Sequence, residues 1–227
     1  LEETLNILTP KYNEVLFRLP NVLDPTAAIW ENDEQNAVES KFLQPTKFDF
    51  EPLPHYEIWA KKWWIDTEKW ADVSGARFWY LKWDIVFLQF AIVNYALSKL
   101  SAAWFMPMLP PVLVREQAMF WTWFLPAWED GTYRVNENED DLYLVWTAEV
   151  PVTSYHSNEI IENLDTPIKY VWYSACFRKE AGSAWKDMRW ILRWHQFDKV
   201  EMVCFCKQED SQKLHDEMVA VEEEIWQ

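Results

Sequence analysis

Residues 170–206 have the sequence YVWYSACFRKEAGSAWKDMRWILRWHQFDKVEMVCFC. Two runs rich in aromatic and β-branched residues flank a polar loop that contains Gly182, one of the chain's 3 glycines. Such runs on either side of a polar, glycine-containing loop predict a long antiparallel hairpin. The rest of the chain can be placed relative to this hairpin.

The polar residues of the hairpin are arranged by face. Because strand side chains alternate, Arg178 and Glu180 are expected on one face of the first arm. By the same rule, Arg193, Phe197 and Glu201 share a face of the second arm. At about 3.3 Å per residue, the first two of these lie roughly 13 Å apart, comparable with a nucleotide from base to outer phosphate. The pattern predicts a site for a planar polyanion beside an amine, although arginines on a hairpin also commonly form surface ion pairs.

Two segments carry a family resemblance. FRKEAGSAWKDMRW at 177–190, followed by RWHQFDKVE at 193–201, resembles motif 2 of the class II aminoacyl-tRNA synthetases in its seryl-tRNA synthetase form. DLYLVWTAEVPVT at 141–153 resembles that family's serine-binding segment. Shorter segments resemble the family in the same order: LPNVLDP, KFDFEPLPHYEI, VSGARF, LKWD, MPMLPPVLV, REQAMF and PIKYV.

The resemblance implies an α+β fold, in which a class II antiparallel β-sheet is flanked by helices. It implies a serine–tRNA ligase that activates L-serine with ATP, aided by Mg²⁺, and transfers it from seryl-adenylate to tRNA(Ser). It also implies a homodimer formed through the motif 1 helix and strand, a cytoplasmic location and no membrane association. Two alternatives remain open: a non-catalytic synthetase-like binding module, and a synthetase for another small amino acid.

The resemblance also assigns roles to residues. Thr147 and Glu149 would bind the serine ammonium, and Glu201 would bind the serine side chain. Arg178 would contact the α-phosphate as the catalytic residue, while Phe197 would stack on the base. The implied serine-binding residues are Thr147, Ala148, Glu149 and Glu201, and the implied ATP-binding residues are Arg178, Lys179, Glu180, Arg193 and Phe197, with Glu180 on the adenine and Arg193 on the outer phosphates.

The implied serine site has a chemical rationale of its own. Serine presents an ammonium group and a hydroxyl, which a carboxylate and a neighbouring hydroxyl can hold. Glu149 is open to another interpretation, an ordinary carboxylate favoured by the dipole at a helix start. His195 lies between the arginines and is expected to be structural. No protein metal ligand is predicted.

The domain organisation follows the resemblance. Residues 1–20 correspond to the end of an N-terminal helical arm, interrupted at Pro10, and residues 21–54 are predicted to be an extended, proline-rich and acidic linker. Residues 55–227 correspond to a partial catalytic core, which the resemblance predicts to be C-terminally truncated. Its last helix places Leu214, Met218 and Ile225 on one face, and no segment resembling motif 3 follows.

Periodicity predicts the remaining elements. Helices are expected near 56–70, 84–101 and 115–120, strands at 73–82 and 142–146, and an acidic turn at 136–141. The helix at 84–101, with Asp84 as N-cap, is apolar nearly all round. It is predicted either to lie in the core or to be buried in the dimer interface, with MPMLPPVLV at 106–114 as an edge or interface strand.

Composition narrows the class of protein. The chain has 227 residues, 50% hydrophobic and 26% charged, which indicates a globular protein. Its formal net charge of -16 disfavours a general polyanion-binding surface, so any RNA contact is expected to be local.

The 3 cysteines favour a reducing compartment. Cys204 and Cys206 share a strand face and suggest either metal binding or core packing. No signal peptide is expected, and residues 104–114 hold too many prolines for a spanning helix.

The chain has 17 tryptophans and 3 glycines, an unusual ratio. Many of the tryptophans stand where the family usually has glycine, whereas Trp63 and Trp226 are expected to be genuine. We hypothesise that the gene's UGA codons are read as glycine in its source. The tryptophans at family glycine positions are Trp30, Trp59, Trp64, Trp83, Trp104, Trp121, Trp123, Trp185 and Trp190, with Trp172 and Trp194 as further candidates.

Overall fold

The computed structural model describes residues 2–16, 18–20, 22–136, 141–180 and 193–227. These residues divide into two compact units, residues 1–53 and residues 54–227. Gly182, Trp185 and Trp190, together with most of the expected acidic turn at 136–141, lie outside the described residues.

The first unit consists of one helix and irregular chain. Helix α1 spans Glu2–Leu16, and Pro10 lies inside it, so the predicted interruption at this proline is wrong. Beyond the helix, the only regular element among the described residues of this unit is the 3-10 turn η1, Asp33–Gln35. Nearly every described side chain here is exposed, as expected for an extended segment.

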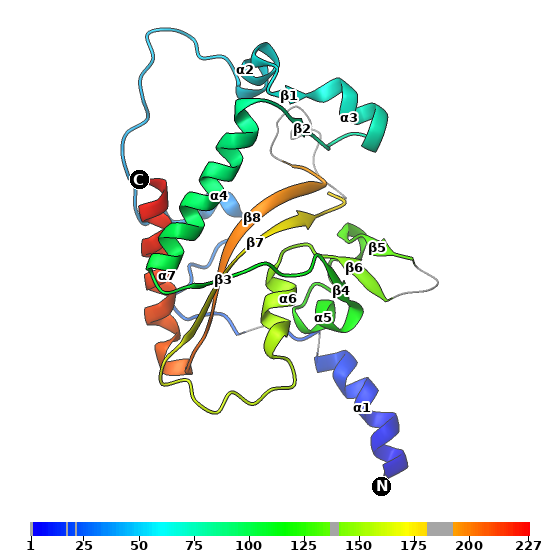
Figure 1. Ribbon diagram of the computed structural model, residues 1–227. Coiled ribbons are helices and arrows are strands. Elements are labelled where there is room, and N and C mark those ends of the chain that lie inside the picture. The colour runs from blue at the N-terminus through cyan, green and yellow to red at the C-terminus, as the bar shows by residue number, and fades with distance from the viewer. Residues whose placement is uncertain (1, 17, 21, 137–140, 181–192) are drawn as a thin grey trace. The chain divides into compact units, whose positions relative to one another are not determined.

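The second unit is built on the predicted hairpin. Strand β7, Ile168–Phe177, pairs antiparallel with β8, Gln196–Phe205, in a register that runs from Ile168↔Phe205 to Phe177↔Gln196. The short strand β3, Met106–Met108, runs parallel to β7 at the opposite edge (Figure 1). Pro107, which has no N–H to donate, therefore lies in an edge strand as predicted. Among the described strands, β8 forms the other edge.

A second sheet carries the segment that precedes the hairpin. Its order is β4 (Leu113–Arg115), β6 (Leu142–Leu144), β5 (Arg134–Val135), all antiparallel. The short helices α5, Glu116–Trp121, and α6, Glu149–Thr153, belong to this layer. Buried residues from these elements form one core: Val114, Met119, Leu125, Tyr143, Val145 and Val150. The N–H of Phe177 donates to the carbonyl of Val145 at 2.8 Å, which ties this layer to the end of β7.

The region before residue 84 differs from its prediction. Helix α2 spans His55–Lys62 and ends there, because Trp63 adopts a left-handed conformation. Strand β1 (Ile65–Asp66) and helix α3 (Thr67–Ser74) follow, so the helix expected at 56–70 is two helices. The strand expected at 73–82 is reduced to β2, Tyr80–Leu81, which pairs with β1.

Helix α4, Asp84–Ala102, and helix α7, Ser211–Trp226, contact each other and pack on the hairpin sheet. Leu100 of α4 joins Phe105, Val171 and Met202 in a buried cluster. Trp83 rather than Asp84 is the N-cap of α4, which corrects the predicted cap.

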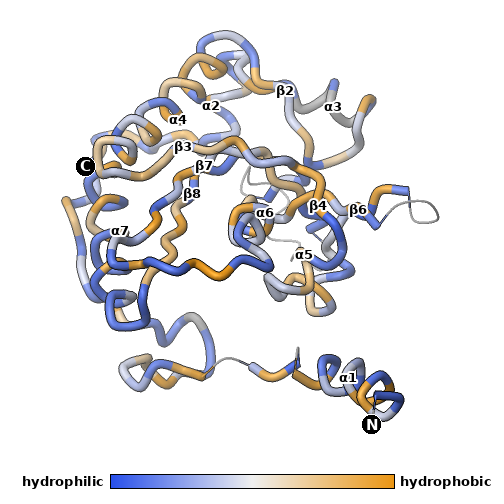
Figure 2. The backbone as a smooth tube through the Cα atoms, turned by 60° about the horizontal axis from the view of Figure 1, so that its bottom comes forward, coloured by the Kyte–Doolittle hydropathy of each residue, from blue (hydrophilic) through white to orange (hydrophobic). Residues whose placement is uncertain are grey.

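Most of α4 remains exposed. Ala96 and Leu100 are its buried residues, whereas Phe87, Phe90 and Ile92 are 75%, 57% and 58% exposed. Figure 2 shows apolar residues gathered on the central strands and recurring along α4. By length and hydropathy alone, α4 could cross a membrane. Because most of its side chains are exposed among the described residues, α4 is not the covered core helix that was one of its two predicted roles.

Candidate active site

The TAE segment, residues 147–149, lies where the chain passes from β6 into α6. Ala148 is the N-cap of α6 and is completely buried, and Thr147 is 3% exposed. The hydroxyl of Thr147 donates a hydrogen bond to Oε2 of Glu201 in β8, at 2.8 Å. Two of the predicted serine-binding segments, far apart in sequence, therefore meet through their side chains.

Lys199 joins this pair, a contact that the sequence analysis missed. Its Nζ donates to the Thr147 hydroxyl at 3.0 Å and lies 3.5 Å from Oε2 of Glu201. The alternation of strand side chains in KVE already places Lys199 and Glu201 on one face. A lysine on the same face as a carboxylate is the signal that could have identified it.

Glu149 is the second carboxyl group at this end of the site. Burial raises its pKa, the nearby Glu201 raises the pKa further, and Lys199 partly opposes both effects. Burial raises a carboxyl pKa because the low-dielectric surroundings disfavour the charged form. Two carboxyl groups served by one lysine leave this end favourable to an incoming cation, which an ordinary exposed carboxylate at a helix start would not be.

Arg178 lies between two aromatic rings just beyond the end of β7. Its guanidinium carbon is 4.8 Å from the ring centroid of Trp146 and 5.0 Å from that of Phe197. Its Nε also donates to the Trp146 carbonyl at 3.4 Å. Both rings are at cation–π distance, so Arg178 and Phe197 are neighbours on the same surface.

The Trp146 ring is held by Gly131. The indole Nε1 donates to the Gly131 carbonyl at 2.8 Å. A Cβ at position 131 would lie 2.7 Å from Cζ2 of Trp146, so this close approach requires glycine.

Glu180 and Arg193 lie outside the strands. Oε2 of Glu180 is 3.4 Å from Nη1 of Arg193, and Arg77 donates to the Glu180 carbonyl at 3.2 Å. The predicted alternation does not reach these residues, since β7 ends at 177 and β8 begins at 196. Arg193 forms the kind of ion pair that was the alternative to phosphate binding, and its side chain is 51% exposed.

Lys179 faces another way. Its N–H donates to the Gly131 carbonyl at 2.8 Å, and its Nζ lies 5.8 Å from the ring centroid of Tyr133. These contacts connect Lys179 to the β5 side of the site rather than to Arg178.

His195 links the two arms of the hairpin beyond their strands. Its Nδ1 lies 2.9 Å from the Arg178 carbonyl and 3.0 Å from the Tyr133 hydroxyl. Its backbone carbonyl accepts from the Arg178 N–H at 2.9 Å. These contacts give His195 a structural role in holding the Arg178 backbone. The sequence analysis did not identify Tyr133, because no motif or periodic pattern marks it.

Two of the three cysteines pack in the core. Cys176 is buried, and burial raises the pKa of its thiol. Cys204 is partly buried, packs with the cluster around Leu100, and lies 3.6 Å from the Met218 sulfur. Within the described ranges, no three His, Cys, Asp or Glu side chains gather in a way that could hold a metal ion.

The comparisons with known proteins agree on one family. The model of the tRNA synthetase class II core domain (G, H, P, S and T) matches residues 132–227. The serine–tRNA ligase of Campylobacter hominis is 40% identical over 210 residues, which cover 92% of this chain and 50% of the relative. That of Corynebacterium glutamicum is 43% identical over 215 residues, covering 95% and 50%. The chain spans about half the length of the curated relatives it matches.

Solved structures agree. Seryl-tRNA synthetase from Pyrococcus horikoshii complexed with ATP matches with a TM-score of 0.88 and 32% identity over 99% of this chain and 54% of that one. Cytoplasmic serine–tRNA ligase from Naegleria fowleri in complex with AMP gives 0.87 and 29%, over 98% and 53%. The predicted α+β synthetase fold and the predicted family resemblance are confirmed, with the refinement that β3 makes the hairpin sheet mixed.

Proposed function

From the premise that this chain is a homologue of the serine–tRNA ligases with a class II tRNA synthetase core, we propose that the protein activates L-serine with ATP and transfers it to tRNA(Ser). The observation that carries the proposal is the contact of Thr147 with Glu201, beside Glu149 and Lys199. On the same hairpin, Arg178 lies against Phe197. An amino acid and a nucleotide would thus bind side by side.

The serine end is suited to an ammonium group. Glu149 and the hydroxyl oxygen of Thr147 would accept its N–H groups, and charge-assisted hydrogen bonds of this kind are about twice as strong as neutral ones. A bound ammonium would also lower the pKa of Glu149, since an opposite charge favours the ionised carboxylate. Thr147 and Glu201 would orient the substrate, with Glu201 accepting from the serine hydroxyl.

Activation would proceed without a protein nucleophile. A carboxylate oxygen of serine attacks the α-phosphorus in line, and the bond from that phosphorus to the bridging oxygen of pyrophosphate breaks. Pyrophosphate leaves with the bonding electron pair, and seryl-adenylate remains. Arg178 would stabilise the negative charge on the α-phosphoryl oxygens, while Phe197 would stack on adenine. Glu180 and Arg193 complete the proposed ATP site, and the ion pair between them would open to free the guanidinium for the outer phosphates.

Mg²⁺ is expected to arrive with ATP. Since no metal-ligating cluster exists among the described residues, this part of the chain supplies no cage for the ion. Mg²⁺ commonly binds through substrate phosphates with one or two carboxylates, which requires no such cage. None of the steps above depends on a protein-bound metal.

The exposed face of α4 supports a homodimer. Phe87 and Phe90 lie about one turn apart on the same side of the helix and are exposed, and so are Met106 and Leu109 in and after β3. Large exposed apolar side chains that gather in a patch are typical of protein interfaces. The double substitution of Phe87 and Phe90 by Glu should convert a dimer into a monomer in sedimentation velocity, and an unchanged dimer would contradict this interface. We also infer a cytoplasmic location, as stated for the Naegleria relative.

Serine-dependent exchange of pyrophosphate into ATP tests the activity. It is best measured on the protein expressed from its complete reading frame, with serine, threonine and alanine in parallel. Exchange with serine that exceeds exchange with the other two is expected. A folded protein with no exchange for any of them would leave the non-catalytic binding module as the better account, and a preference for another amino acid would identify a different synthetase.

A further inference from the structure

Four tryptophans have a backbone conformation that suits glycine. Their φ angles are positive: 58° at Trp63, 63° at Trp83, 67° at Trp104 and 66° at Trp123. In this region the Cβ of an L residue crowds the following carbonyl, so bulky residues are rare there. Glycine has no Cβ and enters the region freely.

Three of the four occupy equivalent places after helices. Trp63 follows α2, Trp104 follows α4 and Trp123 follows α5. In each case the tryptophan N–H donates to the carbonyl three residues back, and the next N–H donates to the carbonyl five residues back. The three pairs of bonds are Trp63→Ala60 with Trp64→Trp59, Trp104→Ser101 with Phe105→Leu100, and Trp123→Phe120 with Phe124→Met119, all between 3.0 and 3.2 Å. This is the Schellman motif, in which the left-handed residue is usually glycine.

Trp83 is the most strained of the four. Its φ of 63° is combined with a ψ of -141° at the N-cap of α4. That combination lies near a region of backbone space that is essentially restricted to glycine.

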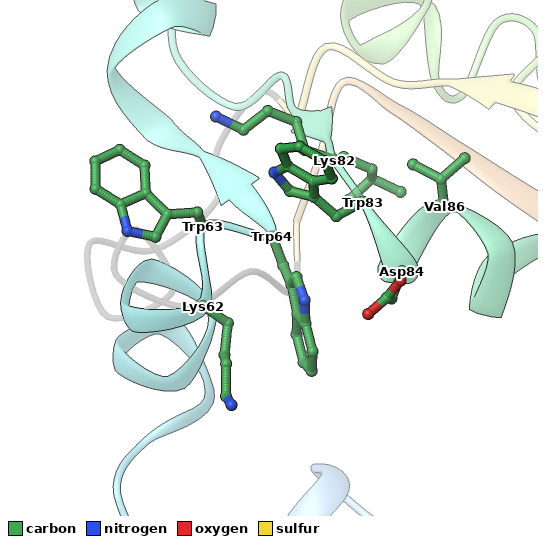
Figure 3. A pocket seen from close by; sticks show the side chains of 8 residues that line it. Lys62, Trp63, Trp64, Lys82, Trp83, Asp84 and Val86 are labelled. Carbon is green, nitrogen blue, oxygen red and sulfur yellow. The ribbon is translucent and has the colours of Figure 1, made fainter.

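The indoles gain no burial that would offset this conformation. Trp63, Trp83 and Trp104 are 72%, 73% and 88% exposed, and Trp123 is 49% exposed. In Figure 3 the side chains of Trp63, Trp64 and Trp83 stand apart from one another around a surface pocket. Trp172, in contrast, is completely buried in β7 and has no positive φ. The strained tryptophans therefore differ from a tryptophan that packs in the core.

We propose that residues 63, 83, 104 and 123 are glycine in the protein as its native source makes it, because a codon written here as tryptophan is decoded there as glycine. The structure supports the sequence hypothesis at positions 83, 104 and 123. It contradicts the expectation that Trp63 is a genuine tryptophan. At Trp30, Trp59, Trp64 and Trp121 the described φ angles are not positive, so the backbone gives no reason for glycine there.

The backbone argument is tested by comparing glycine with alanine at the same position. Both W104G and W104A remove the exposed indole, but only glycine relieves the left-handed strain. We expect the melting temperature of W104G to exceed that of W104A by about 2–4 °C, and likewise for W83G over W83A. The matched control is Trp121, which is exposed but is the last residue of α5 and has no positive φ. There alanine should exceed glycine, since glycine is a poor helix residue. Equal or higher stability of the alanine variants at 83 and 104 would overturn the argument.

Peptide mass spectrometry of protein from the native source tests the decoding itself and does not depend on how any variant folds. Glycine is expected at 63, 83, 104 and 123. Tryptophan at those positions would overturn the proposal.

Lys199 supports a second inference, which rests on the proposed function. We infer that Lys199 is a positioning residue of the serine site, acting through Thr147 and Glu201. Its ammonium donates to the Thr147 oxygen at 3.0 Å, and the single hydroxyl hydrogen of Thr147 then points to Glu201, 2.8 Å away. The lysine thus sets the direction of the Thr147 hydrogen bond and leaves the remaining lone pairs of Glu201 for the substrate.

The same ammonium balances the charge of the site. The groups that act on Glu149 are Glu201, which raises its pKa, and Lys199, which lowers it. Lys199 and Arg178 act on the neighbouring Cys176 in the same direction, lowering its pKa. Without Lys199, the two carboxyl groups would compete for ionisation more strongly, as carboxylates that share a site do.

The test compares K199M, K199R and the wild type. In pyrophosphate exchange, K199M should raise the KM for serine about tenfold or more and leave the KM for ATP unchanged, while K199R should recover most of the loss. K207M is the matched control, because Lys207 is exposed and pairs with Asp165 outside the site. An unchanged KM for serine in K199M would overturn the proposal.

A readout without turnover separates this proposal from the proposed function. The melting temperature of K199M should fall more steeply than that of the wild type as the pH rises above about 4.5, since the Glu149 pKa moves further up. Identical pH profiles for K199M and wild type would contradict the role of Lys199, whether or not serine is the substrate. Wild-type protein without serine-dependent exchange would contradict the proposed function alone.

Discussion

The serine end and the ATP end of the site are built differently. At the serine end, Thr147, Lys199 and Glu201 are joined by contacts of 2.8–3.5 Å, and the side chains of Lys199 and Glu201 are only 27% and 30% exposed. At the ATP end, Glu180 and Arg193 lie beyond the strand ends, and the Arg193 side chain is 51% exposed. In the proposed site, serine would thus meet side chains already joined to one another, whereas ATP would meet side chains beyond the strand ends.

The two ends also differ in charge. In the proposed site, the serine end holds two carboxyl groups with one lysine, and the ATP end holds two arginines with Glu180. In a chain with a net charge of -16, these arginines form a local positive site. The charges match an ammonium group on one side and phosphates on the other, which is why substitutions at the two ends should affect different substrates.

Arg178 should give the largest effect, because it serves the transition state at the boundary of the two ends. R178A should lower the rate of pyrophosphate exchange about 10²–10³-fold, the range for removing one group that stabilises developing charge. R18A, at an exposed arginine of α1, is the control and should leave the rate unchanged. A loss below about threefold in R178A would remove Arg178 from the proposed mechanism.

Glu201 should give a large effect confined to serine. E201Q keeps an acceptor for Thr147 but loses the negative charge, and a hydrogen bond to a charged group contributes about 1.5–3 kcal/mol. The KM for serine should therefore rise about 10–100-fold, with little change for ATP. The same substitution at the exposed Glu224 is the control. Equal changes for both substrates would mean that the two ends are not separate.

Glu149 should affect both stability and binding, in opposite directions. Because its pKa is raised above the ordinary value of 4.5, the folded state holds the proton more tightly, and stability falls as the pH rises through the window between the two values. E149Q should remove this fall, raise the melting temperature at neutral pH, and weaken serine binding. A melting temperature at pH 7 that is lower in E149Q than in the wild type would contradict the sign.

Tyr133 should give the smallest effect, restricted to the ATP end. Y133F removes the hydroxyl near His195 and should lower the free energy of unfolding by about 1 kcal/mol, the usual contribution of one hydrogen bond. Urea denaturation measures this, and the KM for serine should stay constant. A change in serine affinity without a change in stability would show that Tyr133 acts on the other end.

The sequence predicted strand pairing and helix periodicity better than it predicted the backbone conformation of single residues. The hairpin, the edge position of Pro107 and the helix with Leu214 follow from alternation and periodicity, and they form as expected. The prediction of one helix at 56–70 was wrong, because the left-handed conformation of residue 63 ends α2 there. A hydropathy pattern does not indicate this conformation when the residue is tryptophan. Arg178 and Phe197 come together as the hairpin predicted.

Among the site contacts that the sequence did not predict, two join segments far apart in the chain. Lys199 reaches Thr147, and His195 reaches Tyr133, across 52 and 62 residues of sequence. A strand pattern places Lys199 on a face but does not say which element covers that face. Such contacts depend on how the layers pack against each other, which the strand pattern does not specify.

Calorimetric titration with a non-hydrolysable analogue of seryl-adenylate tests most directly whether the two ends form one site. The analogue should bind in one-to-one stoichiometry, and its affinity should fall in both E201Q and F197A, by about tenfold or more in each. An affinity that neither substitution changes would contradict a shared site for serine and ATP on this hairpin.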